Sequence, residues 1–294
     1  MINKYVFFLF IVTLLGCGNK QRKKPITNKI NTTTTSTTTL RKTTPSDTVA
    51  RYTGPDDTLP KVIVPEDARQ VITDNEPVDT VNRAYYLENV NLDSGEIEPK
   101  EMKLHWKGVF TRKDGSAYVK DVRLKFERAE SETDEDGKKT GWLVAGDDKN
   151  EGFYLSGVND LIDGPFQCVK LSKTTLYPGE KEEFNYNGVN YTFYAKGFKK
   201  NGDIYNYRLY LLANVKGHCF NQLLASEEHF GDEMHWEEDA TISIAFIGDI
   251  DGDKIPDVVI ERGAEFEGDS QLFLSKAAGN NAILKHITGF GQSD

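Results

Sequence analysis

Short runs of alternating apolar and polar residues, separated by glycine-containing turns, limit the fold of this chain more than any other feature. The dipeptides Asn187-Gly188 and Asn201-Gly202 each separate two such runs within residues 183–212. Asn-Gly favours the positive φ angles of a tight hairpin, and a period of two places successive side chains on opposite faces of a strand. We therefore expect residues 183–212 to form a three-stranded antiparallel meander.

The same pattern recurs through residues 101–294, which we interpret as one β-rich domain. Its further expected strands are 104–111, 117–126, 141–145, 153–156, 166–171, 219–224, 242–247, 257–261 and 271–274. No long amphipathic helical pattern competes with them. Antiparallel strands at this spacing predict a mainly β fold, either an antiparallel sandwich or a partly open barrel. Residues 61–100 are acidic and weakly patterned, and we expect them to be weakly structured.

The charge of the chain bears on its partners. Of its 294 residues, 46 are acidic and 36 are basic, which gives a net charge of −10. Proteins that bind nucleic acid usually carry a basic patch that faces the phosphates. We therefore expect no nucleic-acid partner.

The first seventeen residues have the order of an export signal. Residues 5–15 form an apolar run, broken only by Thr13, that is too short to span a bilayer. The run ends in Leu14-Leu15-Gly16-Cys17, which resembles the lipobox of bacterial lipoproteins. The resemblance implies that the signal peptide 1–16 is removed and that acyl chains on Cys17 anchor the protein to a membrane of the cell envelope, on the periplasmic side or at the cell surface. The alternative is an ordinary signal peptide with a chance cysteine.

Residues 17–60 follow as a threonine-rich linker. Residues 27–48 have too few apolar side chains to offset the entropy of ordering, so we expect a disordered tether. Three Asp-Thr-aliphatic tripeptides resemble the acceptor used for O-glycosylation of exported proteins in Bacteroidota. The resemblance implies glycans on Thr48, Thr58 and Thr80. Chance is the alternative, because threonine is abundant here.

Two cysteines lie within the β-rich domain. In an exported protein Cys168 and Cys219 could form a disulfide, which would restrain the unfolded chain by about 4 kcal/mol on the entropic model. The alternative is two separate buried thiols that pack as small apolar groups.

Residues 246–260 contain the clearest chemical motif. Four aspartates stand at positions 1, 3, 5 and 9 of a loop between two apolar runs: Asp249, Asp251, Asp253 and Asp257. The carbonyl of Ile255 stands at position 7, where EF-type loops use a main-chain oxygen. Ca²⁺ takes about six to eight oxygen ligands, and carboxylates this close repel one another unless a cation lies among them. Position 12 is Ile260 and not the bidentate Glu of an EF-hand.

The loop resembles the strand–loop–strand calcium motif of FG-GAP/VCBS and integrin-propeller repeats. Their pattern is an apolar strand, Asp-x-Asp/Asn-Gly-Asp-x-x-x-Asp, and a short apolar strand. The resemblance implies one Ca²⁺ ion, bound by the four aspartates within a hairpin at 242–275. The chain has one copy of the motif, so a propeller and its adhesive roles are not implied. A solvated acidic hairpin without an ion is the alternative.

A second acidic cluster and two isolated polar residues are weaker motifs. His229 and His235 lie among acidic residues in 227–239 and could bind zinc together with a carboxylate. Their spacing matches no zinc hydrolase motif. The alternative is an exposed acidic loop. We interpret His105 as a packing residue. Ser156 lacks the Gly-x-Ser-x-Gly surroundings of a hydrolase nucleophile.

Together these motifs predict a membrane-anchored lipoprotein with a calcium-stabilised β domain. Its expected role is non-catalytic, either binding or scaffolding of an envelope or extracellular ligand. The alternative is a hydrolase of envelope or extracellular polymers, suggested by the abundance of carboxylates and histidines. Glycoside hydrolysis would require two carboxylates about 5–10 Å apart in a concave site.

Overall fold

The computed structural model describes residues 62–73, 84–93, 95–130, 138–200, 203–230, 241–263 and 267–293. Besides β-strands, these residues form two short 3-10 helices, η1 (Glu101–Lys103) and η2 (Lys276–Ala278). Among them, no helix has the length and apolar character that crossing a membrane requires. The predicted signal peptide and linker lie outside the described residues, and so do Cys17, Thr48, Thr58 and Thr80.

The first sheet contains five strands in the order β1-β13-β12-β11-β10. They are β1 (Arg69–Ile72), β10 (Lys181–Tyr186), β11 (Val189–Lys200), β12 (Asp203–Val215) and β13 (His218–Phe230). Strands β10 to β13 are antiparallel, whereas β1 pairs parallel with β13. At the β10–β11 turn, Asn187 and Gly188 have φ angles of 48° and 80°, as an Asn-Gly hairpin requires. The predicted meander is confirmed.

Two further sheets come from the N-terminal half of the domain. The second sheet contains β2 (Tyr85–Leu87), β4 (Trp106–Thr111), β5 (Ser116–Val122), β8 (Gly152–Ser156) and β9 (Gly164–Gln167). The small sheet contains β3 (Asn91–Leu92), β6 (Lys125–Ala129) and β7 (Gly141–Ala145). A core that includes Phe110, Tyr154 and Val144 lies between these two sheets.

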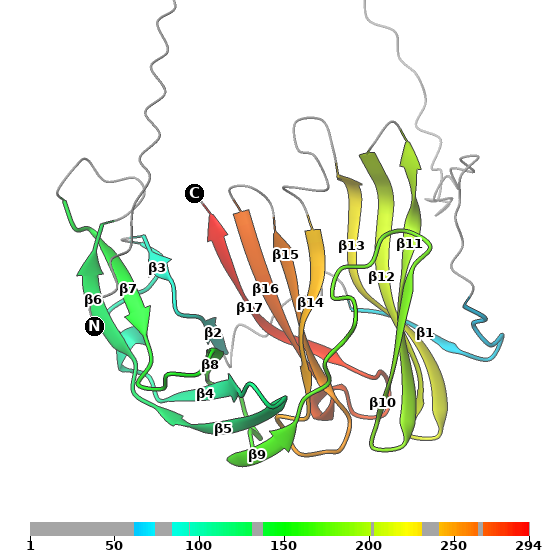
Figure 1. Cartoon of the computed structure of the whole chain (residues 1–294), viewed down its shortest axis with the longest axis horizontal. Coiled ribbons are helices and arrows are strands. Elements are labelled where there is room, and N and C mark those ends of the chain that lie inside the picture. Colours follow the sequence, from blue (N-terminus) through cyan, green and yellow to red (C-terminus); the bar gives the residue numbers. More distant parts are fainter. Residues whose placement is uncertain are drawn as a thin grey trace, which may run out of the picture. The chain divides into compact units, whose positions relative to one another are not determined.

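The central sheet is a meander that lies between the first and second sheets (Figure 1). Its strands are β14 (Thr241–Gly248), β15 (Asp257–Gly263), β16 (Glu267–Leu274) and β17 (Lys285–Ser293). On one face Val258 packs in a core with Leu211 of the first sheet. On the other face Val259 packs in a core with Val109 of the second sheet. Because both faces are covered, β15 needs an uninterrupted apolar run instead of alternation.

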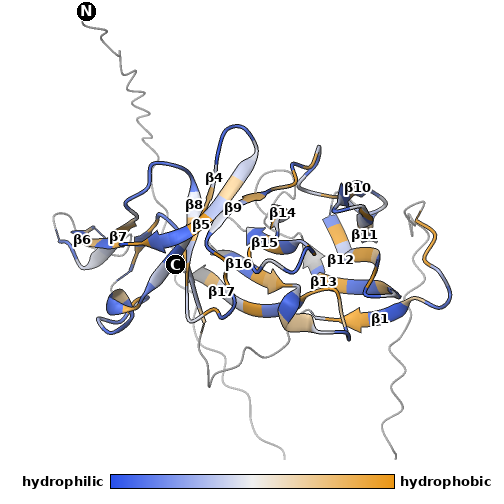
Figure 2. Cartoon of the chain, turned by 90° about the horizontal axis from the view of Figure 1, so that it is seen from below, coloured by the Kyte–Doolittle hydropathy of each residue, from blue (hydrophilic) through white to orange (hydrophobic). Residues whose placement is uncertain are grey.

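The predicted fold class is confirmed. The described residues form mainly antiparallel sheets that do not close into a barrel. Apolar and polar residues alternate along β11 and β12, as Figure 2 shows. The single strand expected at 117–126 is divided into β5 and β6 at residues 123–124, because β5 pairs with β4 and β9 whereas β6 pairs with β7 of another sheet.

The expectation of weak structure for residues 61–100 is wrong for the described part of that segment. It supplies β1, β2 and β3, and it buries Tyr86, Leu87, Leu92 and Ile97. These strands are only two to four residues long, which is too short for a periodic pattern to reveal them. Their neighbours in other parts of the chain determine their conformation.

Candidate metal centre

The aspartate loop, residues 249–256, joins β14 to β15. The strand pair closes with Gly248 opposite Asp257, so the first and last acidic positions of the motif lie at the same end of the hairpin. Within the loop, Gly252 and Lys254 have φ angles of 74° and 71°, and these left-handed conformations turn the chain back on itself. A Cβ atom at Gly252 would lie 2.1 Å from Ile162 Cδ1, so the Ile162 side chain would also have to move to admit a larger residue here.

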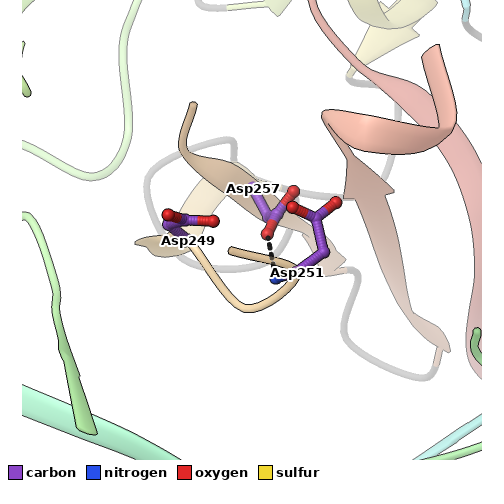
Figure 3. Close-up of side chains that lie close together, drawn as sticks. All are labelled: Asp249, Asp251 and Asp257. Carbon is purple, nitrogen blue, oxygen red and sulfur yellow. Dashed lines mark hydrogen bonds between the residues drawn. The ribbon is translucent and has the colours of Figure 1, made fainter. Parts of the chain in front are cut away.

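Three of the four predicted carboxylates converge. Asp249, Asp251 and Asp257 each offer a carboxylate oxygen, and these atoms lie within 4.8 Å of one another (Figure 3). The residues Asp251 and Asp257 are 1% and 0% exposed. A group of carboxylates at this distance fits a hard divalent cation such as Ca²⁺.

Backbone N–H groups of the hairpin orient these carboxylates. Ile250 N donates to Asp257 Oδ2 at 2.7 Å, and Lys254 N donates to Asp249 Oδ2 at 2.9 Å. These bonds stabilise the ionised form of each carboxylate and fix its direction. The loop is therefore organised around its own acidic side chains.

Ser275 is a buried residue of the site that the motif does not contain. It follows β16, and its backbone N–H donates to Asp257 Oδ1 at 2.7 Å. Its hydroxyl lies 2.8 Å from Asp253 Oδ1, 3.0 Å from Asp257 Oδ1 and 3.2 Å from the carbonyl of Ile255. The next residue, Lys276, donates its backbone N–H to Asp251 Oδ2 at 3.0 Å. In the sequence, the only feature that could have indicated Ser275 is its position directly after a predicted strand, and this is a weak signal.

Asp253 and Ile255, the other two predicted ligands, are directed differently. Asp253 Oδ1 accepts hydrogen bonds from Ile255 N at 2.8 Å and from the Ser275 hydroxyl. The Ile255 carbonyl is within reach of the same hydroxyl. The structure therefore brings together three of the four carboxylates, and it places Asp253 and Ile255 beside them, around Ser275.

Burial raises the pKa of all three clustered carboxyl groups. The pKa of Asp251 rises to about 6 through burial and the charge of Asp253. The pKa of Asp257 rises well above its ordinary value through burial and the charge of Asp251. The pKa of Asp249 is also raised, mainly by burial. A bound cation would reverse these effects by favouring the ionised form.

Two buried oxygen atoms at the loop have no hydrogen-bond partner among the described residues: Asp249 Oδ1 and the hydroxyl of Tyr191. Tyr191 lies on β11 and is 0% exposed. Burial raises the pKa of its hydroxyl, and the charges of Asp253 and Asp249 add to the effect. Buried polar atoms are nearly always paired, so these two atoms at one acidic loop fit a site for a cation and its bound water.

The proposed disulfide between Cys168 and Cys219 is wrong, because both residues are free thiols. Cys168 lies opposite Gly248 and packs against the core between the central and second sheets. Cys219 lies on β13, opposite Asn214. Burial raises the pKa of Cys168 to about 12 and also raises that of Cys219. The alternative of two separate thiols therefore holds.

The other polar residues form no nucleophilic or zinc site within the described residues. His235 and the side chain of His229 lie outside them. The His105 ring is exposed and lies 3.0 Å from Asp121 Oδ1, so it is not the packing residue that we predicted. Ser156 is buried, and its hydroxyl donates to the backbone carbonyl of His105 at 2.7 Å.

Two cavities flank the aspartate loop. One has a volume of about 730 Å³ and is bordered by Asp249, Tyr186 and Lys254. The other has a volume of about 240 Å³ and is bordered by Asp251, Asp160 and Lys276. The loop therefore presents one cluster aspartate to each cavity.

Comparisons with known protein families, curated proteins and solved structures give no match to this chain. The interpretation of the site therefore depends on its sequence motif, geometry and electrostatics.

Proposed function

We propose that this chain is a lipid-anchored protein of the bacterial cell envelope whose β domain is stabilised by one Ca²⁺ ion. Its role is non-catalytic, either binding or scaffolding of envelope or extracellular material. The anchor is the acylated Cys17, and the threonine-rich linker separates it from the domain. The ion lies among Asp249, Asp251 and Asp257, with Asp253 and Ile255 beside it.

The convergence of three aspartates, of which Asp251 and Asp257 are buried and Asp249 is half-buried, carries the calcium proposal. Charges this close and this poorly hydrated destabilise the folded state unless they are protonated or paired with a cation. The possible ligands at this loop are oxygen atoms, which Ca²⁺ prefers. Zinc more often binds the nitrogen of histidine and the sulfur of cysteine. Asp249 Oδ1 and the Tyr191 hydroxyl add buried oxygen atoms that have no partner among the described residues.

Calcium titration calorimetry on the full chain, after removal of metal with a chelator, tests this proposal. We expect one ion per chain. Asp257→Asn is expected to abolish the binding heat, whereas Asp163→Asn, at an exposed aspartate outside the loop, is the matched control and keeps it. The absence of a binding heat in the unmodified protein would refute the calcium assignment.

Membrane fractionation of cells that express the chain tests the anchor separately. Cys17→Ala is expected to move the protein out of the membrane fraction, because the thiol that accepts the lipid is lost. Cys168→Ala is the control and is expected to stay with the membrane. Unchanged fractionation of the Cys17 variant would refute lipid anchoring and leave the calcium assignment standing.

The hydrolase alternative has less support. Glu88 and Glu261 interact, and burial followed by the charge of Glu88 raises the pKa of Glu261. Glu88 is already hydrogen-bonded to the Tyr86 hydroxyl at 2.7 Å. Neither glutamate lines either of the two cavities beside the aspartate loop. These two glutamates therefore do not form the catalytic pair in a concave site that glycoside hydrolysis requires.

A further inference from the structure

The larger cavity beside the aspartate loop has the size of a ligand site. Its volume of about 730 Å³ falls within the roughly 300–1,000 Å³ typical of small-molecule pockets. Its wall comes from three separate parts of the chain: residues 167–169, the β10–β11 turn, and the aspartate loop. A pocket built from three segments around one acidic loop is a natural place to look for a ligand.

Three of the residues that border this cavity have amide side chains. They belong to Gln167, Asn185 and Asn187. Each amide offers donors and an acceptor, and a hydroxyl group likewise both donates and accepts. The two charged residues of the lining, Lys254 and Asp249, have opposite signs, so its formal charge is zero. Val169 and Tyr186 add apolar area, against which the C–H groups of a sugar ring can pack.

Hydrogen bonds hold two of these amides in place before any ligand binds. Asn187 Nδ2 donates to the backbone carbonyl of Lys254 at 2.9 Å, which ties the β10–β11 turn to the aspartate loop. Asn185 Nδ2 donates to Asn190 Oδ1 at 2.8 Å. Each amide keeps further donor and acceptor capacity, and fixing them in advance reduces the entropy lost on binding. An ion that orders the aspartate loop also orders this wall.

The carboxylate cluster alone would leave the coordination of the ion incomplete. Five of the six oxygens of the clustered carboxylates accept hydrogen bonds, and Asp249 Oδ1 accepts none. One oxygen from each aspartate gives three ligands, and Ca²⁺ takes about six to eight. Asp253 and Ile255 can add two more, so at least one position is left for water or a ligand oxygen. Asp249 is the member of the cluster that also borders this cavity.

We propose that this cavity is a calcium-dependent saccharide site, in which hydroxyl groups of a neutral sugar complete the coordination of the ion and hydrogen-bond to the amides of Gln167, Asn185 and Asn187. This inference depends on the proposed calcium binding, and it adds the chemical class of the ligand. The ligand is neutral and rich in hydroxyl groups, as the envelope and extracellular glycans of bacteria commonly are.

Saturation-transfer NMR on the full chain, in a detergent without a sugar headgroup, tests the inference. The probes are the methyl glycosides of mannose, galactose and N-acetylglucosamine, with calcium and after addition of EGTA. We expect at least one probe to bind with calcium and to lose its signal with EGTA. Gln167→Ala and Asn185→Ala are expected to lower the affinity for that probe about tenfold. Asn159→Ala, at the smaller cavity, is the matched control and leaves it unchanged.

Calcium calorimetry on the same samples separates the two proposals. Calcium uptake without binding of any of the three probes would overturn the saccharide site and leave the calcium site intact. Sugar binding that persists in EGTA, or that both amide variants leave unchanged, would also overturn the proposed geometry. Absence of calcium uptake would overturn both. The exposed Gln167 side chain makes a folding defect in its variant unexpected, and a thermal melt checks this.

Discussion

Asp251→Asn is expected to change the stability of the domain in opposite directions with and without calcium. Asp251 is 1% exposed, and burial with the charge of Asp253 raises its pKa from 3.8 to about 6. The folded protein therefore binds more protons than the unfolded chain between these two values, so metal-free stability falls as the pH rises through that window. At neutral pH the difference corresponds to about 3 kcal/mol, which we discount to about 2 kcal/mol because the effective dielectric constant of a surface loop exceeds that of a dry interior.

The amide removes this penalty but also weakens a hydrogen bond. Asp251 Oδ1 lies 3.4 Å from Asp253 N, and Oδ2 accepts from Lys276 N at 3.0 Å. An amide accepts only through its oxygen, so one of these bonds is lost at about 1 kcal/mol. In chelator we therefore expect Asp251→Asn to be about 1 kcal/mol more stable than the unmodified protein. This corresponds to a Tm about 2–4 °C higher for a domain of this size.

Calcium reverses the order of the two proteins. Free calcium at about one hundred times the Kd stabilises the unmodified protein by about 2.7 kcal/mol. The Asn variant lacks one charged ligand and loses most of this gain, so its Tm is lower than that of the unmodified protein. Differential scanning calorimetry at pH 7 in EGTA and in calcium measures both differences. In EGTA the unmodified protein is expected to be more stable at pH 5 than at pH 7, because Asp251 is then protonated. The variant has no carboxyl group at this position and is expected to lack this part of the increase.

Asp163→Asn is the control, because Asp163 is exposed and its partner is Lys107. It is expected to shift the Tm equally in EGTA and in calcium. If Asp251→Asn changed the Tm in the same direction in EGTA and in calcium, that result would refute this reasoning. The charge of this carboxylate would then not both destabilise the metal-free protein and stabilise the calcium-bound one.

Three further predictions address the surroundings of the site. Ser275→Ala removes a buried hydroxyl that lies near oxygen atoms of Asp253, Ile255 and Asp257. We expect this change to lower the calcium affinity measured by calorimetry about tenfold. An unchanged affinity would contradict a role of Ser275 in positioning the ligands. Tyr207→Phe removes the donor to the Leu176 carbonyl and is expected to lower the free energy of unfolding by about 1–3 kcal/mol in urea without changing calcium affinity. At pH 8 iodoacetamide is expected to leave Cys168 unmodified in the folded protein, because its pKa is about 12; mass spectrometry of peptides would detect the adduct, or a disulfide to Cys219, that would contradict this.

Local patterns predict the parts of the fold that local interactions determine. The Asn187-Gly188 turn and the alternation along β11 and β12 were sufficient for the β10–β12 meander of the first sheet, but not for β1. Strand β17 was not predicted, because its sequence contains two glycines and few apolar residues. It pairs with β16 along nearly its whole length, so its conformation depends on a neighbouring strand that a local pattern does not contain.

The candidate site shows the same division. The spacing of the aspartates predicted a convergence, and three of them converge. The positions of Ser275 and Tyr191 could not be predicted, because they reach the loop from β16 and β11, far away in sequence. The orientation of Asp253 depends on the hydroxyl of Ser275, and so a side chain within the motif is directed by one outside it.

These contacts extend the effect of an ion beyond one hairpin. Ser275 connects the aspartate loop to the end of β16, and its carbonyl accepts a hydrogen bond from Lys216 Nζ at 3.1 Å. Lys216 lies in the β12–β13 turn of the first sheet and also donates to the carbonyl of Gly279. Tyr191 on β11 is close enough to this loop for the charges of Asp253 and Asp249 to raise its pKa. Because Ser275 contacts both the aspartates and Lys216 of the first sheet, a cation that neutralises the aspartates would stabilise this connection between the two sheets as well as the turn that binds it.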